Sequence, residues 1–313
     1  MAGLRKGPIH FRVTRVDRGI WAAIAIDGGY ALCNAGIVDL GGTTVVFDSM
    51  LTPEAGTELR RAARRCTGRD PAVVVNSHWH GDHIRGNAAF APAVVISTPK
   101  TRELIRTAGV LQWKSDRREM PAELARLDSP DSVTPEFERA LYRGWFEGTL
   151  RVPAPFRPMP PNVTFEKELS LRGTLRELRL VTYGGGHSPS DVFAYLPEEG
   201  VVFLGDLVSI GVHPAAGDGV PADWAKILRR IGRLEITAAV PGHGPVGNGR
   251  DIRRIESYMG ALVREARSAR RHGKTGAVLA TTKIPEPFRG WKFSNFYPEN
   301  LLRAYRLLGR SSG

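Results

Sequence analysis

Three histidines and one aspartate lie within six consecutive positions of a chain that has only 8 histidines among its 313 residues. In chain order they are His78, His80, Asp82 and His83. Imidazole and carboxylate are the nitrogen and oxygen ligands that zinc prefers. Four such groups packed together without a cation would be costly to bury, because each would need a hydrogen-bond partner. The stretch therefore predicts a metal site.

An apolar, β-branched run at residues 72–75 precedes this stretch and predicts a buried strand. The ligands are then expected on a loop just past the carboxyl end of the strand. Alternate side chains of an extended loop project to one side, and Gly81 would allow a sharp turn that brings His83 round as well. The first two histidines could bind one metal, and the aspartate and the third histidine could bind a second.

Three later segments share one pattern, in which an apolar strand is followed by glycine and then by a ligand-type residue. The three residues are His187, Asp206 and His243. Sheets that contain parallel strands build sites beyond the carboxyl ends of those strands. Alone, each residue has an ordinary explanation: the last histidine could lie in a turn, and the aspartate could cap a helix. Together with the first cluster they form a set that such explanations fit poorly.

The chain carries a net charge of +12, from 44 Lys and Arg against 32 Asp and Glu. Pairs of arginines fall on the polar faces of the expected amphipathic helices, and no basic stripe is interleaved with aromatic residues. This pattern favours a solvated basic surface over a nucleic-acid footprint. We therefore expect a small-molecule substrate, and the sequence leaves the oligomeric state open.

The two cysteines, Cys33 and Cys66, are too few for a disulfide framework, and neither lies near a ligand motif in the sequence. Cys66 shares the apolar side of an expected helix. The amino-terminal residues show no signal-peptide core, and no apolar run reaches the length of a membrane span. These features predict a cytoplasmic protein with no membrane association.

The hydrophobic pattern predicts an α/β protein that begins with an antiparallel meander, whose turns are marked by glycine pairs. Its strands are expected at residues 11–16, 20–26, 34–40 and 43–48. Later strands are expected at 72–75, 94–96, 178–183, 192–196, 201–204 and 238–240, with helices at 53–66, from 98, from 221, at 251–272 and from 298.

Residues 110–162 interrupt this alternation with two segments of helical spacing, followed by five prolines at positions 152–161. So many prolines exclude regular structure and favour a stiff, extended connection. We interpret residues 110–162 as an insertion or cap on a single domain over residues 1–313. Residues 250–313 are interpreted as its C-terminal helical extension.

With these motifs in order, the chain resembles the metallo-β-lactamase superfamily of metal-dependent hydrolases over about residues 10–250. Asp48 ends a strand where the family has its supporting aspartate, and residues 78–83 match the family's His-x-His-x-Asp-His signature. The three later ligand positions match its single-residue motifs. The resemblance implies an α/β (α+β) fold, a four-layer αββα sandwich with the site at one edge.

The resemblance also implies how the ligands are shared. One metal would be held by His78, His80 and His187, the other by Asp82, His83 and His243, and Asp206 would bridge the two. Many true β-lactamases carry cysteine or serine at the bridging position. An aspartate there is typical of glyoxalase II-like thioesterases, lactonases and transfer-RNA-processing nucleases.

These features predict a dinuclear enzyme in which a hydroxide that bridges two Zn²⁺ ions cleaves an ester, lactone, thioester or amide. Iron or manganese would also suit the ligands. Asp82 could steer the proton of the hydroxide in addition to binding metal. Asp48 could orient a ligand histidine through its free ring nitrogen. His213, on an expected loop after Asp206, is a candidate for substrate contact.

Two other enzyme classes remain open at this point. A metal-dependent phosphodiesterase or ribonuclease would use the arginine excess to bind RNA, with strong salt dependence. An iron-dependent oxidative enzyme could use the same histidine and carboxylate ligands. A non-catalytic binding module is disfavoured, because all seven expected ligands are present.

Overall fold

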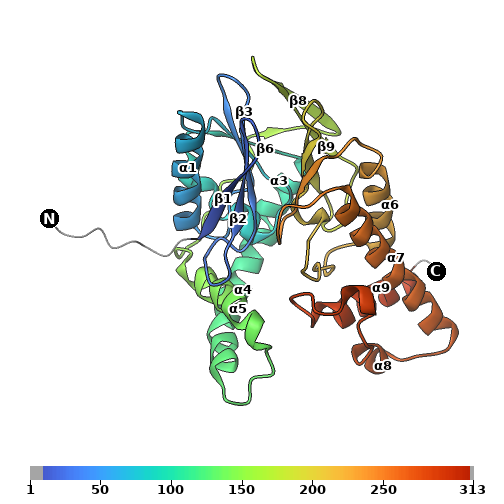
Figure 1. The fold of residues 1–313 in the computed structure, drawn as a ribbon. Coiled ribbons are helices and arrows are strands. Elements are labelled where there is room, and N and C mark those ends of the chain that lie inside the picture. Colours follow the sequence, from blue (N-terminus) through green and yellow to red (C-terminus); the bar gives the residue numbers. More distant parts are fainter. Residues whose placement is uncertain (1–9, 311–313) are drawn as a thin grey trace. The chain divides into compact units, whose positions relative to one another are not determined.

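The computed structural model describes residues 10–310, and the chain divides into two compact units. The first unit contains the chain up to Thr164 and a short later segment, Gly173–Arg176. The second unit contains Phe165–Arg172 and the chain from Glu177 onward. Each unit has one β-sheet and its own helices (Figure 1). This confirms the predicted mixed α/β class.

The sheet of the first unit has seven strands that follow one another in chain order. They are β1 (Phe11–Asp17), β2 (Ile20–Ala25), β3 (Ala35–Asp39), β4 (Thr44–Phe47), β5 (Val73–Val75), β6 (Val94–Ser97) and β7 (Val163–Thr164). The first four form the predicted antiparallel meander, and β4 to β7 are parallel. Because β4 and β5 are parallel neighbours, Asp48 and the histidine stretch leave the sheet at the same edge.

Helix α1 (Pro53–Thr67) connects β4 to β5 and packs its apolar side against the sheet. The Thr52 hydroxyl accepts a hydrogen bond from Ala55 N at the start of the helix, and Gly68 ends it with a φ of 78°. The short helices α2 (Gly81–Ile84) and η1 (Asn87–Phe90) follow β5. Helix α3 (Pro99–Arg106) is capped by Thr98, whose hydroxyl accepts a hydrogen bond from Thr101 N.

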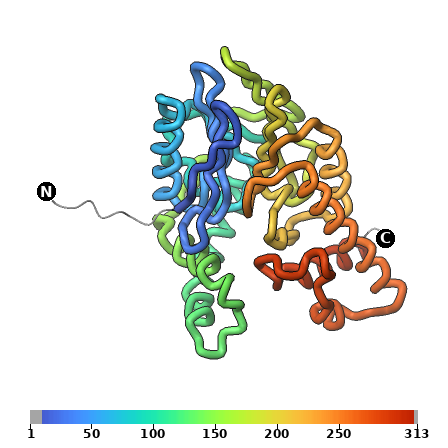
Figure 2. The backbone as a smooth tube through the Cα atoms, viewed as in Figure 1, coloured from blue at the N-terminus to red at the C-terminus, as the bar shows by residue number. Residues whose placement is uncertain are grey.

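The segment predicted as an insertion forms a helical hairpin, which is drawn in green in Figure 2. Its helices are α4 (Ala108–Asp128) and α5 (Glu136–Arg151), held together by Met120, Leu127 and Phe146. The proline-rich residues that follow contain no helix or strand, as predicted. A capping role, like the single domain over residues 1–313, stays a prediction.

The second unit has a five-stranded sheet in the order β12-β11-β10-β9-β8. The strands are β8 (Glu168–Arg172), β9 (Glu177–Thr182), β10 (Val192–Leu196), β11 (Val201–Phe203) and β12 (Ala238–Val240). All neighbours are antiparallel except β11 and β12, which are parallel. The carboxyl ends of β9, β11 and β12 therefore share one edge of the sheet, and each leads into one of the three later ligand positions.

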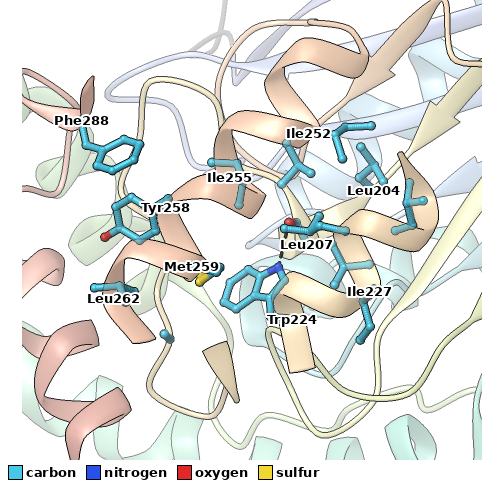
Figure 3. Packing of buried hydrophobic residues seen from close by; sticks show 14 of the residues in the cluster. Leu204, Leu207, Trp224, Ile227, Ile252, Ile255, Tyr258, Met259, Leu262 and Phe288 are labelled. Carbon is cyan, nitrogen blue, oxygen red and sulfur yellow. Dashed lines mark hydrogen bonds between the residues drawn. The ribbon is translucent and has the colours of Figure 1, made fainter. Parts of the chain in front are cut away.

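The helices of the second unit bury the other large core, part of which Figure 3 shows. They are η2 (Gly205–Leu207), α6 (Pro221–Ile231), α7 (Gly249–Arg271), α8 (Gly276–Ala280), η3 (Glu286–Phe288) and α9 (Phe296–Arg310). Trp224 of α6 packs among side chains of α7, and its indole N–H donates to the carbonyl of Leu207 at 3.0 Å. Strand β8 and helix α8 were not predicted. Within residues 10–310, no helix is long and apolar enough to cross a bilayer.

Candidate metal centre

The first unit brings its four ligand-type side chains together at the end of β5. The ring centroids of His78 and His80 are 4.6 Å apart, and those of His78 and His83 are 4.3 Å apart. Asp82 Oδ2 lies 3.4 Å from His83 Nε2. Two ligands of one tetrahedral zinc lie about 3.4 Å apart, given bonds of about 2.0–2.1 Å. The Asp82–His83 pair therefore has the spacing of two ligands on one ion.

The extended alternation predicted for this stretch is wrong beyond His80, because Gly81 begins helix α2. Asp82 and His83 therefore lie on a helical turn. The glycine also has another reason to be there: a Cβ at position 81 would collide with the guanidinium of Arg85. Arg85 is buried and forms an ion pair with Asp116 of α4 at 2.6 Å. Gly81 thus leaves room for the buried guanidinium group of Arg85 beside the ligands.

Asp48 organises two of the histidines. One carboxylate oxygen accepts from Ser77 N at 2.7 Å, and the other faces Ser77 Oγ at 2.7 Å and His83 Nδ1 at 2.8 Å. Ser77 Oγ also lies 2.9 Å from His78 Nδ1. If both Nδ1 atoms carry the proton in these contacts, the Nε2 lone pairs of His78 and His83 remain available for a metal.

Asp48 is 1% exposed, and burial raises the pKa of its carboxyl group while His83 opposes the shift. The Asp48–His83 contact has the form expected from the sequence, in which a carboxylate orients a histidine. The connection from Asp48 through Ser77 to His78 was missed. It could be found only once β4 and β5 were known to be parallel neighbours, since this pairing brings the residues that follow Phe47 and Val75 together at one edge of the sheet.

We expect Asp48→Asn to weaken zinc binding by about 10- to 100-fold, because its amide keeps one acceptor oxygen for three donors. Ser77→Ala should have a smaller effect, since it breaks only the connection to His78. Competition with a chromophoric zinc chelator measures both affinities, and circular dichroism checks the fold. A folded Asp48→Asn variant with unchanged zinc affinity would contradict an orienting role.

In the second unit, Asp206 lies between two histidines and offers a different oxygen to each. Its Oδ2 is 3.5 Å from His187 Nε2, and its Oδ1 is 3.3 Å from His243 Nε2. Both separations are close to the about 3.4 Å expected for ligands that share a zinc ion. Gly242 leaves the space for this carboxylate, because a Cβ there would collide with Asp206 Oδ1. A carboxylate in this arrangement is suited to bridge two metal ions.

Asp191 holds the loop that carries His187, and the sequence did not single it out. Its carboxylate accepts from the backbone N–H groups of Gly186 at 2.7 Å, His187 at 2.9 Å and Ser188 at 3.1 Å. It also accepts from the Ser188 hydroxyl at 2.7 Å. Burial raises the pKa of Asp191 to about 6, although these donors oppose the shift. Asp191 thus fixes the backbone at His187 without reaching its ring.

His213, the candidate for substrate contact, is 1% exposed in the core of the second unit. Its Nδ1 lies 3.1 Å from the hydroxyl of Tyr258, and the rings of Tyr258, Trp291 and Tyr297 surround it. Asn300 Nδ2 donates to the same Tyr258 oxygen at 3.1 Å. A substrate contact stays a prediction that this buried position does not support. The surroundings point instead to a packing role.

Burial lowers the pKa of His213 to about 4, against an ordinary value near 6.5. The unfolded chain therefore binds a proton near pH 6.5 and the folded chain only near pH 4, so acidification over this range favours unfolding. The free energy of unfolding should fall by up to about 3 kcal/mol through this residue. Urea unfolding of the metal-free protein at pH 7 and 4.5 measures the loss. His213→Phe should show a smaller loss, and equal losses in both proteins would contradict the assignment.

Comparison with known proteins finds a family model that matches this chain and solved structures that share its fold. A model of the metallo-beta-lactamase superfamily matches residues 28–243. A metallo-beta-lactamase from Pontibacter korlensis is 20% identical over 80% of this chain and 99% of its own, with a TM-score of 0.58. One from Erythrobacter litoralis, solved with beta mercaptoethanol in the active site, is 18% identical over 82% and 99%, with a TM-score of 0.58. FIM-1 from Pseudomonas aeruginosa, in a mono-zinc form, is 15% identical over 81% and 96%, with a TM-score of 0.59. At these identities the likeness to the solved structures shows a shared fold.

Proposed function

The chain belongs to the metallo-beta-lactamase superfamily, whose model spans more than half of it, and from this membership we propose a dinuclear zinc-dependent hydrolase. Its substrate would be a small carboxylic-acid derivative: an ester, lactone, thioester or amide. The family and the histidine–aspartate groups of the two units support a metal-dependent hydrolase in general. The observation that carries the dinuclear proposal is Asp206, which offers one oxygen to each of two histidines.

The donor set fits zinc, since it contains imidazole and carboxylate groups with ligand-like separations inside each unit. One ion would be held by His78, His80 and His187, and the other by Asp82, His83 and His243, with Asp206 on both. When bound there, such ions would supply a lower pKa for a water molecule and a positive charge beside the carbonyl of the substrate. Iron or manganese would bind the same donors.

The chain itself supplies orientation and a proton acceptor. Asp48 holds His83 directly and His78 through Ser77, so these rings present fixed nitrogens. Asp82 has a side chain that is 15% exposed, and one of its oxygens faces His83. We assign to this carboxylate the second task of accepting the proton of the attacking water. A separate serine or cysteine nucleophile is not required.

A panel of four substrates tests the proposal: a lactone, a thioester, a β-lactam and a phosphodiester. The zinc-loaded protein should hydrolyse at least one of the first three, lose turnover after chelation and regain it when zinc is added back. His80→Ala should lose both bound zinc and turnover. Full activity in a preparation shown to be metal-free would rule out the proposed function.

The phosphodiester in this panel tests the alternative of a ribonuclease. Cleavage of RNA with an affinity that falls steeply with salt would favour that enzyme, because neutralised phosphates release counterions. Turnover of an ester or lactone that changes little with salt would favour a hydrolase that acts on carboxylic-acid derivatives. Elemental analysis of protein purified without added metal distinguishes zinc from the iron of an oxidative enzyme.

A further inference from the structure

A cysteine lies beside the ligands of the first unit, although it is far from them in the sequence. Cys33 precedes β3 and is 0% exposed, and its Sγ donates to the backbone carbonyl of Asp82 at 2.9 Å. Its sulfur, a ring nitrogen of His83 and a carboxylate oxygen of Asp82 all lie within 4.8 Å of one another. Although no cysteine lies near the ligand motifs in the sequence, Cys33 lies beside Asp82 and His83 in the structure.

Three different donor types thus surround one point within the first unit. A thiolate sulfur, an imidazole nitrogen and a carboxylate oxygen are all established zinc ligands. His83 is already oriented by Asp48 through Nδ1, and its Nε2 faces Asp82.

We propose that Cys33 is a thiolate ligand that joins Asp82 and His83 around the same cation, which would be zinc or another thiophilic divalent ion. This inference rests on the proposed function, because it takes Asp82 and His83 as ligands. On binding, the S–H bond breaks and the thiol gives up its hydrogen bond to the Asp82 carbonyl; the sulfur keeps the electron pair and binds the metal, and the proton passes to the solvent. A sulfur donor selects zinc or cadmium over manganese, which prefers oxygen ligands.

Cobalt substitution tests the sulfur ligand directly. The Co²⁺-loaded protein should show a near-ultraviolet sulfur-to-cobalt charge-transfer band, and Cys33→Ser should lose it. Cys66→Ser is the matched control, because Cys66 is the other cysteine of the chain and packs in the apolar cluster around α1. That variant should keep the band. Cys33→Ala is made in parallel, and circular dichroism checks that each variant folds.

Metal affinity gives a second readout. Cys33→Ser should weaken cadmium binding by at least about 10-fold and leave manganese binding within about 2-fold. A wild-type cobalt spectrum without the band would overturn the proposal, and so would a band that persists in both Cys33 variants. If His80→Ala abolishes metal binding in that case, the hydrolase proposal survives and only the thiolate ligand fails. Wild-type protein that binds no divalent metal would overturn both.

Discussion

Asp206→Ala is expected to lose at least one bound zinc per chain and to reduce turnover by roughly 10³-fold or more. The residue offers one oxygen to His187 and the other to His243, so its loss should affect both metal positions. A metal pair contributes several kcal/mol to the stabilisation of a transition state, and each 1.36 kcal/mol corresponds to a factor of ten in rate. Zinc content by elemental analysis and turnover of the best substrate in the panel measure the two effects.

Asp206→Asn separates the loss of charge from the loss of shape. Asp206→Asn keeps one acceptor oxygen and nearly the same volume, so it should retain more zinc than the alanine variant and still lose most turnover. Asp223→Ala is the matched control, because Asp223 is an exposed aspartate whose carboxylate pairs with Lys226 at 2.8 Å. It should leave zinc content and turnover unchanged. A folded Asp206→Ala protein with two zinc ions and full activity would contradict the bridging role.

The seven ligand candidates could be read from the sequence because each lies shortly after the end of a strand: four follow β5, and the other three follow one strand each. His187, Asp206 and His243 illustrate this, since β9, β11 and β12 all end at one edge of the second sheet. A local pattern of strand, glycine and ligand is therefore enough to place each residue at that edge. What such a pattern cannot supply is the register of the strands.

The residues that were missed depend on that register or on distant packing. Ser77 meets Asp48 because the parallel strands β4 and β5 end at the same edge of the sheet, and Cys33 meets Asp82 across a separation of 49 residues. No local spacing contains these contacts. Strand β8 was missed for a different reason: its sequence, Glu-Leu-Ser-Leu-Arg, has only two apolar residues, and as an edge strand it buries none of its side chains completely.

Helix α6 shows the opposite case, in which an apolar stripe defines the element and its buried face. Trp224, Ile227, Leu228 and Ile231 recur at helical spacing in the sequence, and all four are buried. The largest of them, Trp224, is 0% exposed. The sequence did not indicate that this indole also donates to Leu207 O at 3.0 Å and lies edge-on to His187, with ring centroids 5.3 Å apart (Figure 3 shows the first contact).

Trp224→Ala should therefore lower the free energy of unfolding by about 3–5 kcal/mol, the usual range when a large aromatic side chain is removed from a core. Trp224→Phe keeps an aromatic ring in the cavity but removes the donor, so its loss should be smaller. Urea unfolding followed by far-ultraviolet circular dichroism measures both, since tryptophan fluorescence changes with the substitution itself.

The alanine variant should also bind zinc more weakly under conditions in which it remains folded, because the backbone at Gly186 packs against Trp224. A Cβ at position 186 would lie 3.2 Å from both the Cα and the Cγ of Trp224, so the loop that carries His187 rests on this residue. A cavity there gives the loop room to move, while Asp191 still holds its backbone N–H groups. Wild-type zinc affinity in a Trp224→Ala protein destabilised by several kcal/mol would show that Asp191 alone positions the loop.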